Sequence, residues 1–574
     1  MQDQIQHLVF PSATNRYFCP VAECPTAAGG LRPGWEIDGQ GLRAHVDAHL
    51  LGQLPGLPPE QWMSRRGMVA CRLCGRMVSR RCNGGIHRTC LGAELAPPTR
   101  QMPVSDELPT LMDICLARIE TREFICVGLF PAVEREFNKC TANVIAFSRR
   151  DAWSHIDTEN DTLAHQRARS AWIEWFMFAK TCLLVLPGGK AKEKRNNNIL
   201  ANRIARWSTG ERMSLWTEGL HITKADQPLR RRRKSNVAGE EVAEQTLNKK
   251  REEVIDLARR GLPGKAVRHA SSLGLAPDTL ATEMKMKSKF VEPPPTQKSS
   301  QRMPAPEANT ITEEGIVHAI HSFGAGVSAG PSGHRPDFYK QLIGEKGDKP
   351  AVPLLTTLGN LLAAGGAPSE LRPFIGCAKG TALYKRAKDG SDDARPACSG
   401  ETIRRIVGKV LLGTDIEVLR DHLLPHQLAV GVRAGVEAMP HVVRQWRDDN
   451  ANDPDKVLVN FDEGNAHNEV DRHSFLVRMR EIAPGICKWL EYIYPTDVET
   501  YVFYRGRVIL SKAGGQQGCP LIGACHALVK RMVHESLGIV PALPGSALHL
   551  PRIDHPVDLD IAPLFAYDGS LQCS

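Results

Sequence analysis

The segment from Val457 to Arg472, with the sequence VLVNFDEGNAHNEVDR, constrains the fold more than any other part of the chain. Its first half alternates mostly apolar residues and predicts a buried strand that ends on Asp462. Gly464 interrupts this run, and a helix is expected to begin at Asn465. An aspartate at a strand end commonly forms a turn or caps a helix, but it can also hold a divalent metal ion in a polymerase palm. The segments that follow favour the second interpretation.

A predicted hairpin comes next. Residues 501–510, with the sequence YVFYRGRVIL, read as two short strands that turn at Arg505-Gly506. They lead directly into residues 511–521, SKAGGQQGCPL, and then into a helical run from Ile522 into Ser536. The order is therefore strand, aspartate, hairpin, glycine-rich loop and helix.

These segments resemble motifs A and B of the reverse transcriptases of non-LTR (LINE-like) retrotransposons. The shared pattern is D-x-x-N-A-x-N-x-V-D-R, a hairpin, and G-x-Q-Q-G-x-P-L. In that family the first aspartate binds the catalytic metal, and the Gln-Gly loop supports the template strand and the incoming nucleotide. The resemblance implies these roles for Asp462 and for Gln517 and Gly518. It also places His467 where the family usually keeps an aromatic residue beside the sugar.

Residues 378–409 resemble the fingers motifs of the same family, in which a Lys strand and an Arg-Pro strand form a hairpin over the nucleotide triphosphate. By position the match falls on Lys385 and Arg395, with Arg404, Arg405 and Lys409 on the helix that follows. Cations suit this place because the triphosphate and the template backbone are both anionic.

The candidate for motif C, a hairpin that carries two adjacent aspartates in the family, is Leu564–Leu571 (LFAYDGSL). Aligned on its glycine, Asp568 matches the second aspartate, and Tyr567 stands where the first, metal-binding one belongs. Two-metal nucleotidyl transfer depends on carboxylates to position the ions, so this departure should weaken metal binding. The chain ends at Ser574, shortly after this hairpin, and we expect a polymerase without a thumb.

Two cysteine–histidine clusters near the N-terminus predict zinc modules. The first has the spacing C-x4-C-x20-H-x3-H, and the second combines C-x2-C with H-x2-C, a set in which either Cys82 or His87 can be the third ligand. The alternative is a group of free cysteines in a loop-rich segment. The predicted zinc ligands are Cys19, Cys24, His45 and His49 in the first module and Cys71, Cys74, His87 and Cys90 in the second.

Charge and hydropathy narrow the class of protein. The formal net charge is +9, and the run QPLRRRRK at residues 227–234 is either a solvated linker, a nuclear localisation signal or a phosphate-binding arm. The N-terminus lacks the order of a signal peptide. The most apolar window, Trp172–Leu186, carries two charged residues and is too short to span a bilayer. We therefore expect a protein of the nucleus or cytoplasm that has no membrane segment.

The predicted fold class is α+β: a right-hand polymerase fingers–palm module, with an antiparallel palm sheet and helices, preceded by small zinc-finger modules and a helical basic region. The expected domains are zinc modules (1–95), a helical region of unknown role (96–225), a basic helical segment (226–290), a Pro/Ser-rich linker (291–310) and the polymerase module (311–574).

The implied function is RNA-directed DNA polymerase, with an RNA template, a DNA primer or target and dNTPs as partners. Mg²⁺ or Mn²⁺ would serve at the palm and Zn²⁺ in the N-terminal modules. Two alternatives stay open: a catalytically inactive retroelement remnant that still binds nucleic acid, and a zinc-finger nucleic-acid-binding protein.

Overall fold

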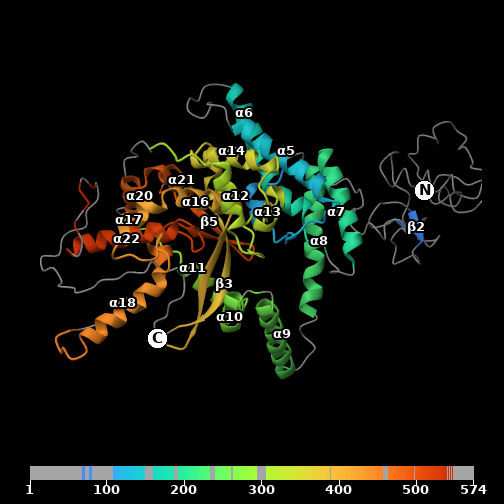
Figure 1. Ribbon diagram of the computed structural model, residues 1–574. Coiled ribbons are helices and arrows are strands. Elements are labelled where there is room, and N and C mark those ends of the chain that lie inside the picture. Colours follow the sequence, from blue (N-terminus) through green and yellow to red (C-terminus); the bar gives the residue numbers. More distant parts are fainter. Residues whose placement is uncertain are drawn as a thin grey trace, which may run out of the picture. The chain divides into compact units, whose positions relative to one another are not determined.

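The computed structural model describes most of the chain beyond residue 107. The described residues are 108–148, 159–186, 192–232, 239–259, 261, 263–293, 306–387, 389–456, 463–496, 498–538, four positions between 541 and 546, and two short strands, β1 (Met68–Ala70) and β2 (Met77–Ser79). The fold is mixed α/β, with many helices and one four-stranded sheet (Figure 1).

The chain divides into two compact units. One comprises Met1–Leu108 with Leu186–Asp226, and the other comprises Pro109–Val185 with Gln227–Ser574. In the first unit, β1 and β2 pair antiparallel, and α7 (Glu193–Ser208) lies beside α8 (Arg212–Arg232). The buried pair Arg203–Glu218, at 2.8 Å, joins these two helices.

The larger unit contains the four-stranded sheet, in the order β4-β3-β5-β6. The strands are β3 (Ala378–Arg386), β4 (Asp392–Gly400), β5 (Thr500–Tyr504) and β6 (Arg507–Ser511). Two antiparallel hairpins, β3–β4 and β5–β6, meet through a short parallel pairing of β3 with β5. Parallel neighbours require a long crossover connection, and the helices between β4 and β5 provide it.

Helices account for most of the larger unit. The first of them, α4, ends at Leu116, five residues before Thr121, which forms an isolated bridge with Leu184. Short 3₁₀ turns, η6 (Ser369–Leu371) and η7 (Pro484–Ile486), precede α15 and α21. The α-helices are α4 (Leu111–Leu116), α5 (Phe130–Ser148), α6 (Glu159–Cys182), α9 (Gly239–Arg259), α10 (Pro263–Ser271), α11 (Leu280–Ser288), α12 (Glu313–His321), α13 (Pro336–Ile343), α14 (Ala351–Ala363), α15 (Arg372–Ile375), α16 (Thr402–Thr414), α17 (Ile416–Leu423), α18 (Gly435–Asp449), α19 (Ala466–Glu469), α20 (Arg472–Ile482), α21 (Cys487–Ile493) and α22 (Ile522–Ser536).

The apolar stripe of α6 forms part of the core beside α5 and α13. Trp172, Trp175 and Phe176 are fully buried, and Phe137 of α5 packs edge-on against Phe338 of α13 at 5.0 Å between ring centroids. The hydroxyl of Thr121 donates to the carbonyl of Gly333 at 2.6 Å, so the loop after α4 is bonded to the loop before α13. Residues 109–185 thus pack within the same unit as the sheet.

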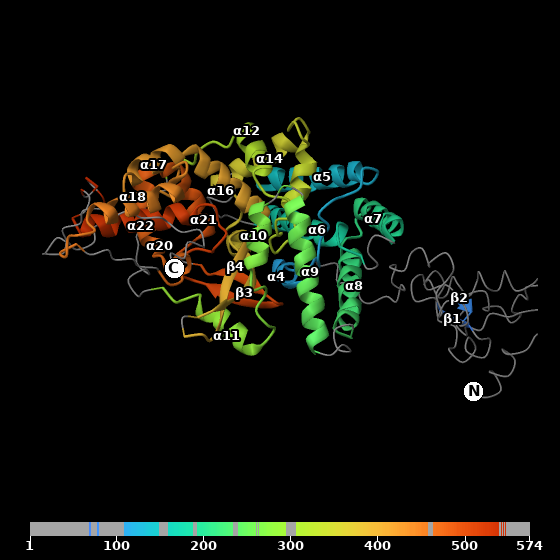
Figure 2. The ribbon, with the colours of Figure 1, turned by 60° about the horizontal axis from the view of Figure 1, so that its bottom comes forward.

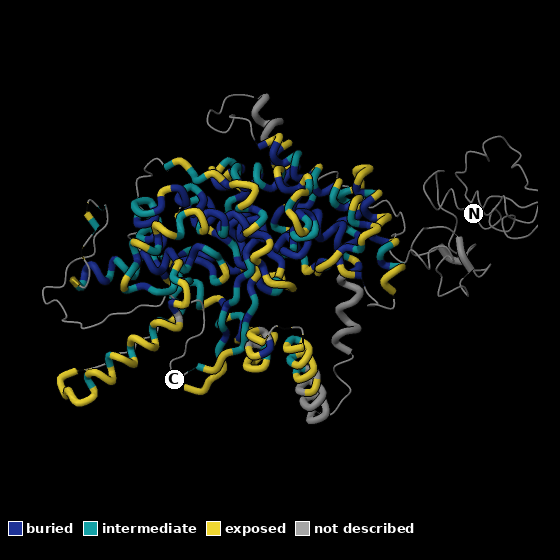
Figure 3. The backbone as a smooth tube through the Cα atoms, in the orientation of Figure 1, coloured by how far each residue is buried: buried dark blue, intermediate teal, exposed yellow. Residues whose placement is uncertain are grey.

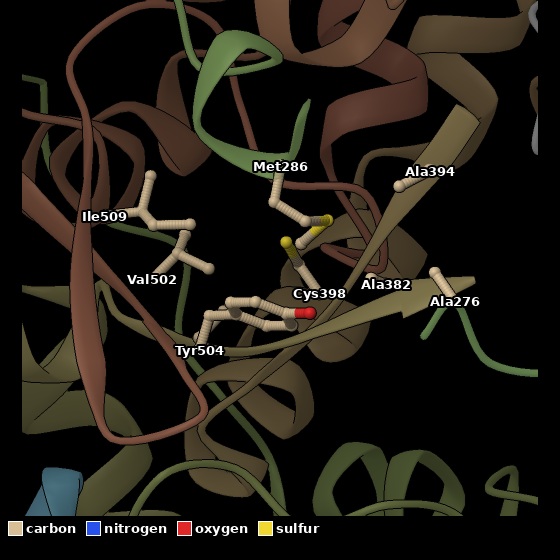
Figure 4. Packing of buried hydrophobic residues seen from close by; sticks show 9 residues of the cluster. Ala276, Met286, Ala382, Ala394, Cys398, Val502, Tyr504 and Ile509 are labelled. Carbon is tan, nitrogen blue, oxygen red and sulfur yellow. The ribbon is translucent and has the colours of Figure 1, made fainter. Parts of the chain in front are cut away.

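The β3–β4 hairpin has one packed face and one open face. Even-numbered residues from Ala378 to Ala382 on β3, and from Ala394 to Gly400 on β4, are buried, whereas the odd-numbered residues between them are half-buried or exposed. On the packed face α11 lies across the sheet, with Met286 reaching Cys398 and the β5–β6 side chains (Figures 2 and 4). On the opposite face α4 covers the base of the sheet through contacts of Cys115 with Cys377 and Phe503.

Burial increases from the hairpin end toward the body of the larger unit. The far end of β3–β4 and most of α18 are exposed, while the region around α16, α20 and α22 is buried (Figure 3). The β3–β4 hairpin therefore projects from a buried base, and its far end is exposed.

Several predicted elements are confirmed. The hairpin at residues 501–510 is β5–β6, with its turn at Arg505 and Gly506, and the helix that follows the glycine-rich loop is α22. The predicted buried helix at 171–186 is the second half of α6, which ends at Cys182. The expected antiparallel sheet is only partly correct, because the described strands form a mixed sheet in which β3 and β5 run parallel.

Candidate functional site

Residues 463–472 pack directly on the loop 511–521. The backbone N–H of Gly515 donates to the carbonyl of His467 at 2.7 Å. Gly514 has φ +56°, and a Cβ at this position would lie 2.2 Å from the carbonyl oxygen of Asn468, so no larger residue fits without a shift. We call this contact the buried joint. It brings the segment that follows the candidate metal aspartate against the segment that carries Gln517 and Gly518.

Arg472 locks the buried joint. Its guanidinium, 1% exposed as a residue, donates from Nε to the carbonyl of Gly514 at 2.6 Å, from Nη1 to that of Pro495 at 2.9 Å and from Nη2 to that of Ser511 at 2.9 Å. Burial lowers the pKa of Arg472 to about 10, so the group stays charged at neutral pH. A planar fork with several donors suits this task, since the acceptors are mainly main-chain carbonyls, joined by the Ser511 hydroxyl at 3.4 Å.

A second buried arginine, Arg404 of α16, also bonds to this loop, although it lies far before the loop in the sequence. Its Nη1 donates to the side-chain oxygen of Gln516 at 2.6 Å and to the carbonyl of Gly376 at 2.7 Å. The Gln516 amide in turn donates to the carbonyl of Gly376 at 3.0 Å, and its backbone N–H donates to the hydroxyl of Tyr494. The Tyr494 ring lies 4.9 Å from the Arg404 guanidinium and 5.4 Å from that of Arg472. The aromatic ring therefore bridges the two cations.

The loop also bonds to the fingers-like hairpin. The backbone N–H of Cys398, on β4, donates to the carbonyl of Gln517 at 3.1 Å. Gly518 has φ +103°, and a Cβ there would approach the Cys398 carbonyl to 2.3 Å. The glycine that the family resemblance singles out is thus required by the close approach of two main chains.

Glu463 joins the start of the described segment to α22. Its carboxylate accepts from Nε2 of His526 at 2.7 Å and from the ammonium of Lys530, one turn further along the helix. Partial burial alone would raise the pKa of Glu463, but the hydrogen bonds and charges of these two partners outweigh it and lower the pKa to about 2. The ring of His467 packs edge-on against that of His526, with 5.9 Å between centroids.

The predicted phosphate-binding cations lie on the open face of the hairpin. Lys385 on β3 is exposed and Arg395 on β4 is half-buried, and both belong to the odd-numbered face, as does Lys379. We call the surface formed by Lys379, Lys385 and Arg395 the basic face. No hydrogen bond or ion pair to another described residue occupies any of the three side chains.

Two further predicted phosphate ligands prove to be structural. The sequence placed Arg404 and Arg405 beside the triphosphate, but only 1% and 7% of these residues are exposed. Arg405 donates to the carbonyl of Ser328 at 2.7 Å and lies near the buried carboxylate of Glu401, which itself accepts from Ser332. The sequence pattern of an amphipathic helix does not distinguish a buried arginine from an exposed one. The burial of these two side chains therefore could not be predicted from the sequence.

The predicted metal ligands lie outside the described residues. These are the palm carboxylates Asp462 and Asp568, and the zinc ligands Cys19, Cys24, His45, His49, Cys71, Cys74, His87 and Cys90. Within the part of the chain that the structure describes, no group of three His, Cys, Asp or Glu side chains could hold a metal ion. The described site therefore consists of the buried joint, the Glu463 pair and the basic face.

Sequence reasoning missed Arg472, Tyr494, Gln516 and the Glu463–His526–Lys530 contacts. The signal for the last was present, since His526 and Lys530 are four residues apart on one face of a predicted helix. Tyr494 had no signal, because its role depends on two arginines that are distant in the chain.

A scan against protein-family models and a search of the curated proteins found no match to this chain. Among the helices that the structure describes, none is both long enough and apolar enough to cross a membrane.

Proposed function

We propose that the larger unit is a template-directed nucleotidyltransferase of the reverse transcriptase type, as found in non-LTR retrotransposons. The observation that supports this is the convergence of three segments distant in sequence. Residues 463–472, 511–521 and 395–405 meet through main-chain hydrogen bonds and two buried arginines. The resemblance requires these three segments to be neighbours, and nothing in their local sequence dictates it.

In the proposed reaction a primer 3′-hydroxyl attacks the α-phosphate of a dNTP, a new P–O bond forms, and pyrophosphate leaves. The hydroxyl proton passes to solvent or to a carboxylate. Lys385 and Arg395 would neutralise the triphosphate, and the loop at Gln517 and Gly518 would support the template base and the incoming nucleotide. The buried joint holds this loop in place, so that it does not have to be ordered anew in each cycle.

Carboxylate oxygens are the ligands that Mg²⁺ prefers, and when bound the ions would polarise the α-phosphate and the primer hydroxyl. Glu463 is the described carboxylate next to Asp462, and both of its oxygens are bonded, one to His526 and one to Lys530. Ligation would therefore fall to Asp462 and Asp568. Glu463 instead fixes the chain immediately after Asp462 to α22.

Primer extension on a poly-rA template with an oligo-dT primer, in Mg²⁺ and then in Mn²⁺, tests the proposal. We expect dTTP incorporation that falls by on the order of 100-fold or more in Asp462→Ala. Asp455→Ala is the matched control, because Asp455 is an exposed acid on the approach to the same segment and is expected to leave incorporation unchanged.

If the natural chain shows no incorporation, Tyr567→Asp decides the next step. Rescue by this substitution would locate the defect in motif C and support the proposed polymerase architecture. Continued absence of synthesis, together with intact binding of the primer–template, would replace the polymerase by a nucleic-acid-binding remnant.

For the N-terminal region we propose two zinc modules that assist nucleic-acid binding. Metal analysis of the purified chain should find about two zinc ions per molecule, and Cys19→Ser with Cys71→Ser should remove them. Zinc content that does not change in the double variant would reject the assignment.

A further inference from the structure

Cations around the sheet fall into two groups according to their partners. Those that surround α11 are bonded to protein groups: Lys289 pairs with Asp393 at 3.2 Å and Arg505 with Asp278 at 2.6 Å. Arg507 also pairs with Glu283, Lys512 with Glu292, and Lys285 with the carbonyl of Asp392. These cations fasten α11 across the packed face of the sheet, and their charges are already used.

The basic face on the opposite side differs. Lys379, Lys385 and Arg395 have no hydrogen bond or ion pair with a described residue, and the same holds for Arg118, which follows α4. The Arg118 side chain lies at the β5–β6 turn, where a Cβ on Gly506 would be 3.9 Å from its Cδ. Arg118 thus adds a cation beside the hairpin that carries the basic face.

The cations at the base are close enough to influence one another. Although Lys379 is exposed, the protein atoms around its ammonium group lower its pKa, the carboxylate of Glu120 opposes this, and the charges of Arg335 and Arg118 lower the pKa further. Arg335 is occupied by the carbonyl of Thr121 and by Glu123. Arg118 and Lys379 are therefore close enough to act together on one anion, and Glu120 already offsets part of the charge of Lys379.

We infer that Arg118 extends the basic face beyond Lys379 into a track that binds the phosphates of a nucleic-acid strand. This inference rests on the proposed function and adds two phosphate contacts to the pair assigned to the triphosphate. From Lys379 to Lys385 the strand covers roughly 20 Å at about 3.3 Å per residue, which matches about six nucleotides of a strand that rises about 3.4 Å per nucleotide. Contacts of this kind read charge and not base identity, so binding should be independent of sequence.

The test measures binding of a labelled 20-nucleotide single-stranded RNA to the full chain by fluorescence anisotropy, between about 50 and 300 mM KCl. The variant is Arg118→Gln with Lys379→Gln, and the matched control is Arg433→Gln with Arg444→Gln, two exposed arginines near and on α18. We expect the slope of log K against log salt to fall by about 1.4 in the variant, at about 0.7 per lost contact, and the Kd at 100 mM KCl to rise about tenfold. The control should change neither quantity.

Each outcome separates this inference from the polymerase. An unchanged slope in the Arg118/Lys379 variant, an equal loss in the control, or no RNA binding by the natural chain would overturn the phosphate track. RNA binding that depends on Arg118 and Lys379, in a protein that never extends a primer even with Tyr567→Asp, would support the track and reject the polymerase. Primer extension by the natural chain, with an unchanged salt slope in the Arg118/Lys379 variant, would support the polymerase and reject the phosphate track.

Discussion

The buried joint and the basic face use the same kind of side chain for opposite purposes. Arg472 in the joint and Arg404 beside it are buried and donate to main-chain carbonyls and to Gln516. On the basic face, Lys385 and Arg395 project from a hairpin whose other side is packed, and they have no bonded partner among the described residues. A buried cation needs protein acceptors to offset its lost hydration, whereas an exposed one keeps water until a ligand replaces it. Cations in the first region hold the fold, and those in the second are available to a ligand.

The sharpest test of this difference removes a cation from each region. Arg472→Met should lower the free energy of unfolding by about 4 kcal/mol, because three buried carbonyls lose a charged donor. Lys385→Met should change it by less than about 0.5 kcal/mol, since the side chain is exposed. Urea unfolding followed by circular dichroism gives both values. Equal effects in the two variants would erase the distinction.

A glycine pair tests whether the contact between the loop 511–521 and β4 depends on close main-chain approach. Gly518→Ala should cost about 3 kcal/mol, because the new methyl group would approach the Cys398 carbonyl to 2.3 Å at a φ of +103°. Gly523→Ala, within the first turn of α22 and with nothing inside 4 Å, should be neutral or slightly stabilising. Thermal unfolding of both variants checks the prediction. A tolerated alanine at position 518 would mean that β4 and the loop can separate without cost.

Two adjacent glutamines of the loop differ in whether their side chains stabilise the fold. Gln516→Ala should cost about 2 kcal/mol, since its side chain bonds both Arg404 and Gly376, while Gln517→Ala should be nearly neutral in stability because only its carbonyl is used. In primer extension we expect the Gln517 variant to show the larger effect. It should raise the apparent KM for dNTP while the stability of the protein stays unchanged. Identical behaviour of the two variants in both assays would contradict this division.

The smallest predicted effect concerns Glu463 and depends on pH. Its pKa is lowered from 4.5 to about 2, so its ion pairs stabilise the fold fully above pH 4.5, and this contribution disappears as the pH falls toward 2. Because the side chain is about one-third exposed, we expect only about 1 kcal/mol at pH 7. The difference in unfolding free energy between the natural chain and Glu463→Gln, measured at pH 7 and pH 3, should shrink at the lower pH. A difference that grows on acidification would contradict the assignment.

Local patterns in the sequence predicted several helices and strands correctly, but they did not predict how these elements contact one another. Alternation and a turn signal predicted β5–β6, and an apolar run predicted the second half of α6. The parallel pairing of β3 with β5 could not be predicted, because it joins residues far apart whose own patterns are compatible with many neighbours. The same limit explains Arg404, which the resemblance placed on the triphosphate and the structure buries under Gln516. Burial of a long cation is decided by tertiary packing.

Arg472 recognises the loop by its main chain, and this has a consequence for how the loop can change. The shorter bonds go to the carbonyls of Ser511, Gly514 and Pro495, which remain in place whatever side chains the neighbouring positions carry, and longer ones go to the Ala513 carbonyl and the Ser511 hydroxyl. Positions such as Lys512 and Cys519 are only half-buried and contribute no main-chain acceptor to Arg472. A change of side chain at these positions would leave the main-chain bonds of Arg472 in place, although Lys512 also pairs with Glu292 and Cys519 interacts with Arg404 and Tyr494. The path of the loop is thus fixed mainly through its own main chain, and its side chains remain available for other contacts, such as the pair of Lys512 with Glu292.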